Sequence, residues 1–164
     1  MGEMFLDLDG FTGESLDYDH LDEIELIGWG WGIKNNASFN IRDVREGATH
    51  TAFDHLTITK VVDSASVTLV QFCAQGNHIS KGYLACRKNT GERTNLSDFL
   101  TIEFSDLKVL SVTWPEKGAE DHGYPEIVVF QFSKFDMTYK KQANEGELYG
   151  SMNFPFSIPD QKVS

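Results

Sequence analysis

The chain has 164 residues, and its 25 acidic against 14 basic side chains give a net charge of −11. That length fits one domain, residues 1–164, and a hydrophobic content of 40% can form a packed core, which excludes a disordered chain. The excess of acid excludes binding to free nucleic acid and to anionic membrane surfaces, because both need a basic footprint.

The N-terminus carries no visible targeting signal. It lacks a basic start followed by a long apolar run, so no secretory leader is expected. No apolar run approaches the roughly 20 residues of a transmembrane helix. We therefore expect a chain that is made in the cytoplasm without membrane insertion, and any export must use another route.

The first strand and loop lie in an acidic region. Nine acids fall between Glu3 and Glu25, a cluster that usually forms a solvated face. Apolar residues alternate from Met4 to Leu8, which predicts a strand, and Gly10 to Asp22 has no period and is expected to be a loop.

A second strand is predicted from Glu23 to Ile33, with a change of apolar face after Leu26. Ile24 and Leu26 share the first apolar face, and the second consists of Ile27, Trp29, Trp31 and Ile33. A change of face by one residue indicates a bulge or a bend. The other side of the second half holds only Gly28, Gly30 and Gly32. A bare face either lines open space or packs closely on another backbone, and both alternatives remain open.

The rest of the chain predicts one helix among strands. Lys34 to Asp54 is expected to be a long loop or hairpin, and His55 to Val62 a strand. Apolar residues at helical spacing predict a helix over about Ser64–Gln75, which Gly76 ends. Further strands are expected at Ile79 to Lys88, Leu100 to Val109, Val128 to Tyr139 and, more briefly, Phe154 to Ile158.

Two changes of phase in the late strands predict the architecture. The alternation shifts near Ser105-Asp106 and again near Ser133-Lys134. If these strands form an antiparallel hairpin, the two shifts lie opposite each other, as at the corner of a small barrel. The fold class is therefore mainly β: a compact, bent antiparallel barrel or sandwich with one helix.

Motifs for chemistry are weak. Cys73 and Cys86 are expected to be ordinary buried thiols rather than a disulfide or, with His78, a metal site. Asp7 with Asp9, and Glu23 with Glu25, each share a strand face, which is typical of a solvated strand more than of a paired-carboxylate hydrolase. No catalytic residue, metal or cofactor is expected.

The chain resembles a known family in three stretches. The first runs through Gly13-Glu14-Ser15, Asp17, His20, Glu23-Ile24-Glu25 and Trp29-Gly30-Trp31-Gly32. The second holds Leu56-Thr57-Ile58-Thr59-Lys60, Asp63, Ala65-Ser66, Ala74 and Gly76-Asn77-His78, and the third is the late hairpin, Leu100 to Val112 with Val128 to Tyr139. In this order they resemble the haemolysin-coregulated proteins (Hcp), the tube proteins of bacterial type VI secretion. Val67, the segment from Arg42 to Asp54 and the tail from Ala143 depart from the family's usual pattern.

The resemblance implies a role without catalysis. Family members form six-membered rings that stack into a hollow tube inside a contractile sheath, behind a spike protein, and the lumen holds small effector proteins. It implies a cytoplasmic protein that leaves through the apparatus. We expect Gly28, Gly30 and Gly32 to border the lumen. Ring-to-ring or subunit contacts are expected from the long loop, at Phe39, Ile41, Arg42, Asp43, Val44, Arg45 and Glu46. Two alternatives are a carboxylate- or metal-dependent hydrolase and a monomeric ligand-binding sandwich.

Overall fold

A computed structural model describes residues 3–36, 50–88, 97–116, 123–142 and 148–159. Within these ranges the chain forms ten strands and one helix. In chain order they are β1 (Met4–Leu8), β2 (Ile24–Gly30), β3 (Ile33–Asn36), β4 (His50–Phe53), β5 (Leu56–Val61), α1 (Ala65–Gln75), β6 (His78–Lys88), β7 (Ser97–Thr113), β8 (Pro125–Gln131), β9 (Lys134–Gln142) and β10 (Leu148–Ser157). The mainly β fold with one helix is therefore confirmed. No helix in the described ranges has both the length and the apolar character needed to cross a bilayer.

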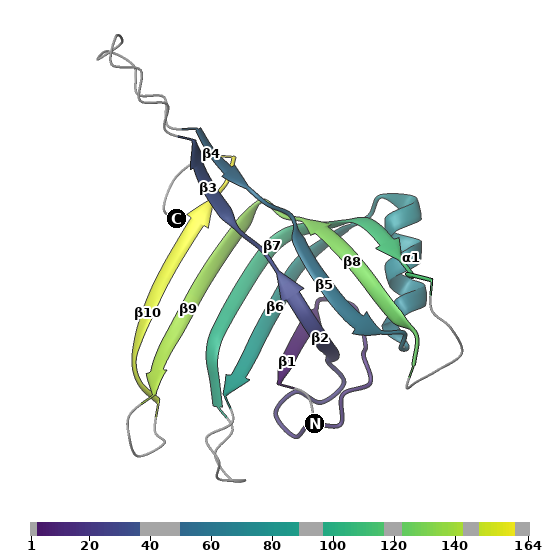
Figure 1. The fold of residues 1–164 in the computed structure, drawn as a ribbon, viewed down its shortest axis with the longest axis horizontal. Helices are drawn as coiled ribbons and strands as arrows, with labels where there is room; N and C mark the ends of the chain where they lie inside the picture. The colour runs from purple at the N-terminus through teal and green to yellow at the C-terminus, as the bar shows by residue number, and fades with distance from the viewer. Residues whose placement is uncertain (1–2, 37–49, 89–96, 117–122, 143–147, 160–164) are drawn as a thin grey trace.

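Six antiparallel strands close into a barrel. They follow the order β7-β6-β1-β2-β5-β8, and β8 pairs again with β7. Closure removes the free edges that these strands would otherwise expose. Figure 1 shows β2, β5 and β8 on the near side of the barrel, with β6 and β1 behind them.

A single strand, β7, belongs to both the barrel and a sheet that extends from it. Its 17 residues pair with β9 over Leu100–Ser105 and with β8 over Lys108–Thr113. Between these stretches Asp106 has a φ of +60°. The extension formed by β9, β10 and the first half of β7, which we call the wing, lies to the left in Figure 1.

The paired phase shifts that the sequence predicts are confirmed. Asp106 interrupts the alternation of β7, and Ser133 separates β8 from β9. The Ser133 amide donates to the Ser105 carbonyl at 3.1 Å, so the two irregularities lie at the same level. Strand β7 and the β8–β9 segment therefore bend at the same level, at the border between the barrel and the wing.

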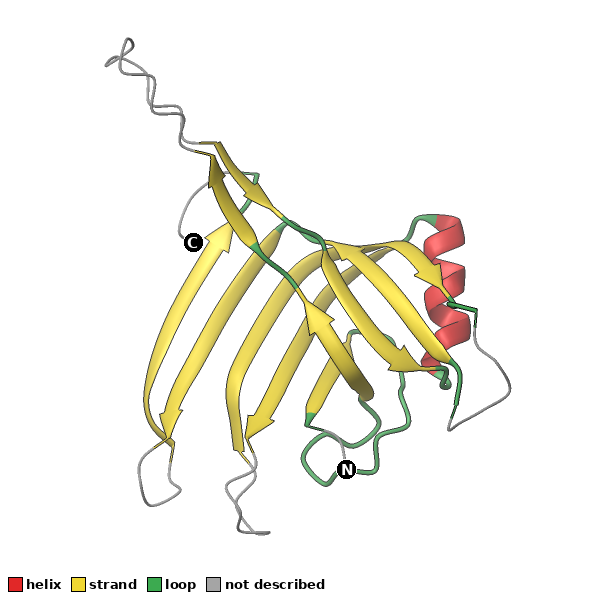
Figure 2. Ribbon diagram, viewed as in Figure 1, coloured by secondary structure: helices red, strands yellow, loops and turns green. Residues whose placement is uncertain are grey.

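The predicted helix and its end are also confirmed. Gly76 follows α1 with a φ of +67°, and its amide donates to the Phe72 carbonyl. Leu69 is buried in the core, while Phe72 and Cys73 pack against the core from α1. Figure 2 shows the helix outside the barrel.

Of the two forms expected for residues 34–54, a loop or a hairpin, the described ends form a hairpin: β3 and β4 pair and leave the barrel at the top of Figure 1. Two other details of the prediction were wrong. The last strand is longer than Phe154 to Ile158, because β10 pairs with β9 from Leu148 onward. Ile27 and Ile33 do not join the core: the predicted bulge lies between Leu26 and Gly28, and it leaves Ile27 without a strand partner and exposed.

Candidate assembly surfaces

The bare side of β2 faces open space at two of its three glycines. A Cβ on Gly28 or Gly30 would meet no atom within 4 Å, whereas one on Gly32 would lie 2.9 Å from the Asp54 carboxylate. The glycines therefore do not share one environment. Of the two alternatives for the bare face, Gly28 and Gly30 therefore border open space within this chain and do not pack closely on another backbone.

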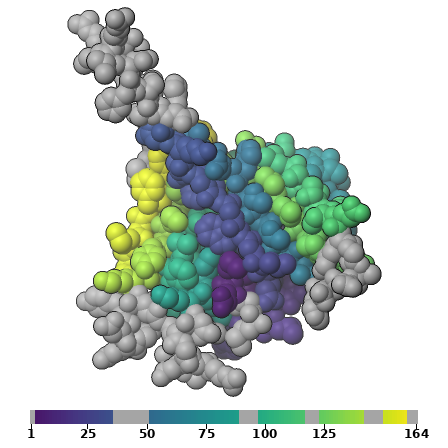
Figure 3. All heavy atoms as spheres, viewed as in Figure 1, coloured from purple at the N-terminus to yellow at the C-terminus, as the bar shows by residue number. Residues whose placement is uncertain are grey.

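Neighbouring strands continue this surface with uncharged residues, none of them aromatic. Across the sheet Gly28 pairs with Thr59, and Thr59 with Ile127 of β8. The next row runs through Gly30, Thr57, Val129 and Ser111. We call these two rows, which Thr113 completes, the smooth stripe. Figure 3 shows that the atoms of β2, β5 and β8 adjoin one another on the near side of the molecule.

Both tryptophans of this region lie on the opposite side and pack against the core, as predicted. The Trp31 ring contacts Phe135 at a centroid distance of 4.7 Å and Phe132 at 5.6 Å. The Trp29 indole N–H donates to Cys86 Sγ at 3.2 Å. Both rings remain half-buried rather than fully enclosed.

A buried arginine fastens the acidic loop. Arg87 comes from β6, and its guanidinium contacts Asp17 Oδ2 at 2.7 Å, Asp19 Oδ2 at 3.1 Å and Asp98 Oδ1 at 3.4 Å. Its Cζ lies 5.3 Å from the centroid of the Phe5 ring. Burial, the largest single effect, works to raise the pKa of Asp17. The hydrogen bond and charge of Arg87, together with backbone hydrogen bonds from Asp19 and His20, outweigh it, so the pKa falls below the usual value.

His20 supports the same loop. Its ring stacks on Phe5 at 4.3 Å, with Nδ1 2.8 Å from Glu23 Oε2 and Nε2 3.1 Å from Asp98 Oδ1. Burial raises the pKa of Glu23, although the hydrogen bond with His20 opposes that shift. A purely solvated acidic face was therefore the wrong interpretation for Asp17, Asp19 and Glu23, which bind buried cationic or polar partners.

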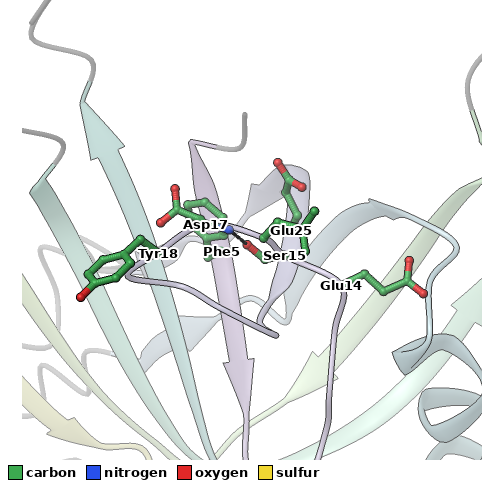
Figure 4. A pocket seen from close by; sticks show the side chains of 7 residues that line it. Phe5, Glu14, Ser15, Asp17, Tyr18 and Glu25 are labelled. Atoms are coloured by element: carbon green, nitrogen blue, oxygen red, sulfur yellow. Dashed lines mark hydrogen bonds between the residues drawn. The ribbon is translucent and has the colours of Figure 1, made fainter. Parts of the chain in front are cut away.

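The fastened loop turns polar groups inward and apolar groups outward. Ser15 and His20 are buried, while Leu16 and Tyr18 are almost fully exposed. In Figure 4 Tyr18 and Glu14 point away from the loop on different sides, and the Ser15 hydroxyl accepts from the Asp17 amide. A hollow lies here, lined by Phe5, Glu14, Ser15, Leu16, Asp17, Tyr18 and Glu25. This inverted pattern is typical of a surface that meets a partner.

A second internal ion pair joins the barrel to the helix. Lys60 of β5 and Glu126 of β8 are both fully buried, and Ser66 Oγ of α1 donates to Glu126 Oε1 at 3.1 Å. Lys60 Nζ also contacts Asp63 Oδ1 at 2.8 Å. Sequence reasoning missed this pair, although Lys60 and Glu126 each fall in phase with buried apolar residues on their strands.

The remaining predicted site residues do not form a site within the described part of the chain. The expected stacking residues, Phe39 to Glu46, lie outside the described residues. Cys73 and Cys86 are free thiols; Cys86 is buried, as expected, and Cys73 is half-buried. Among the described residues, no group of three or more His, Cys, Asp or Glu side chains is placed to hold a metal.

Comparison with known proteins assigns the family. A family model described as "Type VI secretion system effector, Hcp" matches residues 5–139. The chain belongs to the Hcp family. It is 30% identical over 144 residues to "Protein hcp1" of Pseudomonas aeruginosa, and the match covers 88% of this chain and 86% of that protein.

Solved structures agree with this assignment. Hcp1 from Salmonella typhimurium superposes with a TM-score of 0.77 at 26% identity, over 98% of this chain and 97% of its own. A structure described as a type six secretion system protein has a TM-score of 0.89 over the whole of both chains. At 23% identity it supports the Hcp fold alone.

Proposed function

We propose that this Hcp protein is a structural subunit of the type VI secretion tube. Six copies form a ring, rings stack into a hollow tube inside the contractile sheath and behind the spike protein, and the chain leaves the cell through this apparatus. Its role is mechanical and not enzymatic. Membership in the Hcp family is the observation that carries the proposal.

The lumen wall is formed by the smooth stripe in this proposal. A channel that passes folded cargo needs a surface without projecting or strongly charged side chains. Gly28, Gly30 and their Thr, Val and Ile partners offer such a surface, with open space above Gly28 and Gly30. Small effector proteins rest against this stripe, and Gly32 borders it near Asp54.

Native mass measurement tests the ring. At tens of micromolar the protein is expected at six times 18.5 kDa. A persistent 18.5 kDa species would contradict the proposal and favour a monomeric ligand-binding barrel.

Replacing a stripe glycine tests the lumen wall. Gly30→Arg should leave ring mass and melting temperature nearly unchanged, because a side chain there enters open space. It should alter the amount of co-purified small effector. Asn153→Arg adds the same charge on the exposed β10 strand and should leave effector retention unchanged. If Gly30→Arg instead prevents ring recovery, the stripe is a packing surface and cargo binds elsewhere.

Stacking is assigned to the segment of Phe39, Ile41, Arg42, Asp43, Val44, Arg45 and Glu46. Apolar side chains interspersed with both signs of charge suit a contact with another copy. Deleting residues 40–48 should leave a folded protein that is secreted poorly. Normal stacking and secretion after this deletion would exclude the assignment.

A further inference from the structure

The wing has an apolar face that this chain covers only in part. Phe135 and Phe156 pair across β9 and β10, and both pack against Phe53 of β4. Farther along the same face lie Tyr139, Met152 and Phe154, whose side chains are 44%, 74% and 47% exposed. The face thus continues beyond the part that Phe53 covers.

A cation adjoins this uncovered part. Lys141 follows Tyr139 by two residues on β9, so it lies on the same side of the sheet. The ion pairs of the described residues do not include Lys141. We call Tyr139, Lys141, Met152 and Phe154 the wing face.

A second surface has the opposite charge. It is a hollow of about 570 Å³, lined by Glu3, Met4, Glu14, Glu25, Leu26, Ile27, Val61, Val62 and Asp63. Leu16 borders it through the neighbouring hollow, which shares Glu14 and Glu25. We call this surface the acidic face. Leu16 and Ile27 are 91% and 56% exposed, while the nearby cations Lys60 and Arg87 are buried in ion pairs.

The two surfaces complement each other but cannot meet within one copy. One is apolar with Lys141 at its border, and the other is apolar with the carboxylates of Glu3, Glu14 and Glu25, none of which forms an ion pair among the described residues. Figure 1 places β10 at one side of the molecule and the end of β5, which carries the acidic face, toward the other. A contact between different patches on identical copies is heterologous, and such contacts close into rings when the rotation fits.

We propose that the wing face of one copy receives the acidic face of the next copy, and that this contact is the seam of the ring. The inference rests on the proposed ring and specifies which surfaces form it. The exposed apolar side chains supply the buried centre of the seam, and Lys141 pairs with carboxylates of the acidic face at its border.

Two variants, each altered on one surface, test the seam. Leu16→Asp with Ile27→Asp alters the acidic face, and Lys141→Asp with Met152→Asp alters the wing face. Each should weaken association roughly 30-fold or more, because a carboxylate is buried against an apolar or acidic surface. Alone, each variant should stay at 18.5 kDa at concentrations where the wild type forms rings.

Mixing the two variants gives the decisive result. The acidic-face variant keeps an intact wing face, and the wing-face variant keeps an intact acidic face. An equimolar mixture should therefore form one intact seam and give particles of twice 18.5 kDa and nothing larger. The remaining surfaces are both acidic, so the pair cannot close into a ring.

A matched control uses the other side of the wing. Lys140→Asp with Asn153→Asp makes the same change in charge on neighbouring positions of β9 and β10 that face the opposite way. Its rings should match the wild type. Melting curves of all variants exclude misfolding, and single Leu16→Asp and Met152→Asp variants replace any double variant that melts early.

Each outcome separates the seam from the ring proposal. Wild-type rings together with intact rings from either variant overturn the seam and leave the ring standing. The seam is also overturned if both variants are monomeric and their mixture yields no two-copy particle. In that case the two faces contact something other than each other, such as a stacked ring or an effector. A wild type that never associates overturns the ring itself, and the seam with it.

Discussion

Lys60 Nζ lies 3.0 Å from Glu126 Oε1, and neither side chain is exposed. The pair joins neighbouring strands β5 and β8. The same lysine reaches Asp63 and Ser66, and Trp114 donates its indole N–H to Glu126 Oε2 at 2.9 Å. The first turn of α1 is thereby attached to the barrel through buried, charge-assisted hydrogen bonds.

Removal of one partner of this pair should be costly. Glu126→Ala leaves the Lys60 ammonium buried with fewer acceptors, and we expect a loss of about 3–5 kcal/mol in the free energy of unfolding. Lys60→Met combined with Glu126→Leu removes both charges and should cost much less. Urea denaturation of the single and double variants measures this difference. Equal losses for both would show that packing, and not the unpaired charge, sets the cost.

The fastening of the acidic loop should weaken in acid. Because the folded pKa of Asp17 is lowered, its contribution is complete above about pH 3.9, the unfolded value, and is lost as the pH falls through the lower folded pKa. Arg87→Met removes the partner, so it should lose less stability than the wild type when the pH falls from 5 to 3. Thermal melts across this range measure the slope. Parallel slopes would mean that Arg87 does not set the pKa of Asp17.

Two glycines should respond oppositely to an added methyl group. A Cβ on Gly13 would overlap the Glu23 carbonyl, while one on Gly30 meets nothing within 4 Å. Gly13→Ala should cost about 1–3 kcal/mol through overpacking. Gly30→Ala should be neutral or stabilise by up to about 1 kcal/mol, because it restricts the unfolded chain. Chemical denaturation compares the two, and a destabilised Gly30→Ala would contradict the open surface assigned to β2.

The Cys86 thiol should be protected in the folded protein. Burial raises its pKa, against the opposing hydrogen bond from Trp29, so little thiolate forms near neutral pH. A thiol reagent should modify Cys86 only after unfolding. Cys73→Ser leaves Cys86 as the sole thiol, so the rate can be followed directly. Rapid labelling of this variant in buffer would show that the strand environment opens.

The strands and bends were predictable because alternation reports which side of a strand is buried. The phase changes at Leu26, Ser105 and Ser133 each mark a bend or bulge in the structure. The length of β10 was not predictable in this way. Its register shifts between Tyr149 and Ser151, and Met152 and Phe154 remain exposed, so the pattern is broken.

The partners of the buried charges could not be found from the sequence, because they lie far apart along the chain. Arg87 and Asp17 are 70 residues apart, and Ser66 and Glu126 are 60 apart. A lone charged residue in a strand usually faces water, and only the fold brings its partner close. The wing face was missed for a related reason. Its apolar side chains are typical of a core, and only the structure shows that the barrel ends before it covers them.

Barrel closure through β8 has a consequence for synthesis of the protein. β8 comes after the helix and seven other strands, and it pairs with β5 on one side and β7 on the other. Until the ribosome has released residues 125–131, β5 and the second half of β7 each present an unpaired edge. A nascent chain that stops before this segment is therefore expected to aggregate or to require a chaperone, which makes translation of the β8 segment the step that closes the barrel.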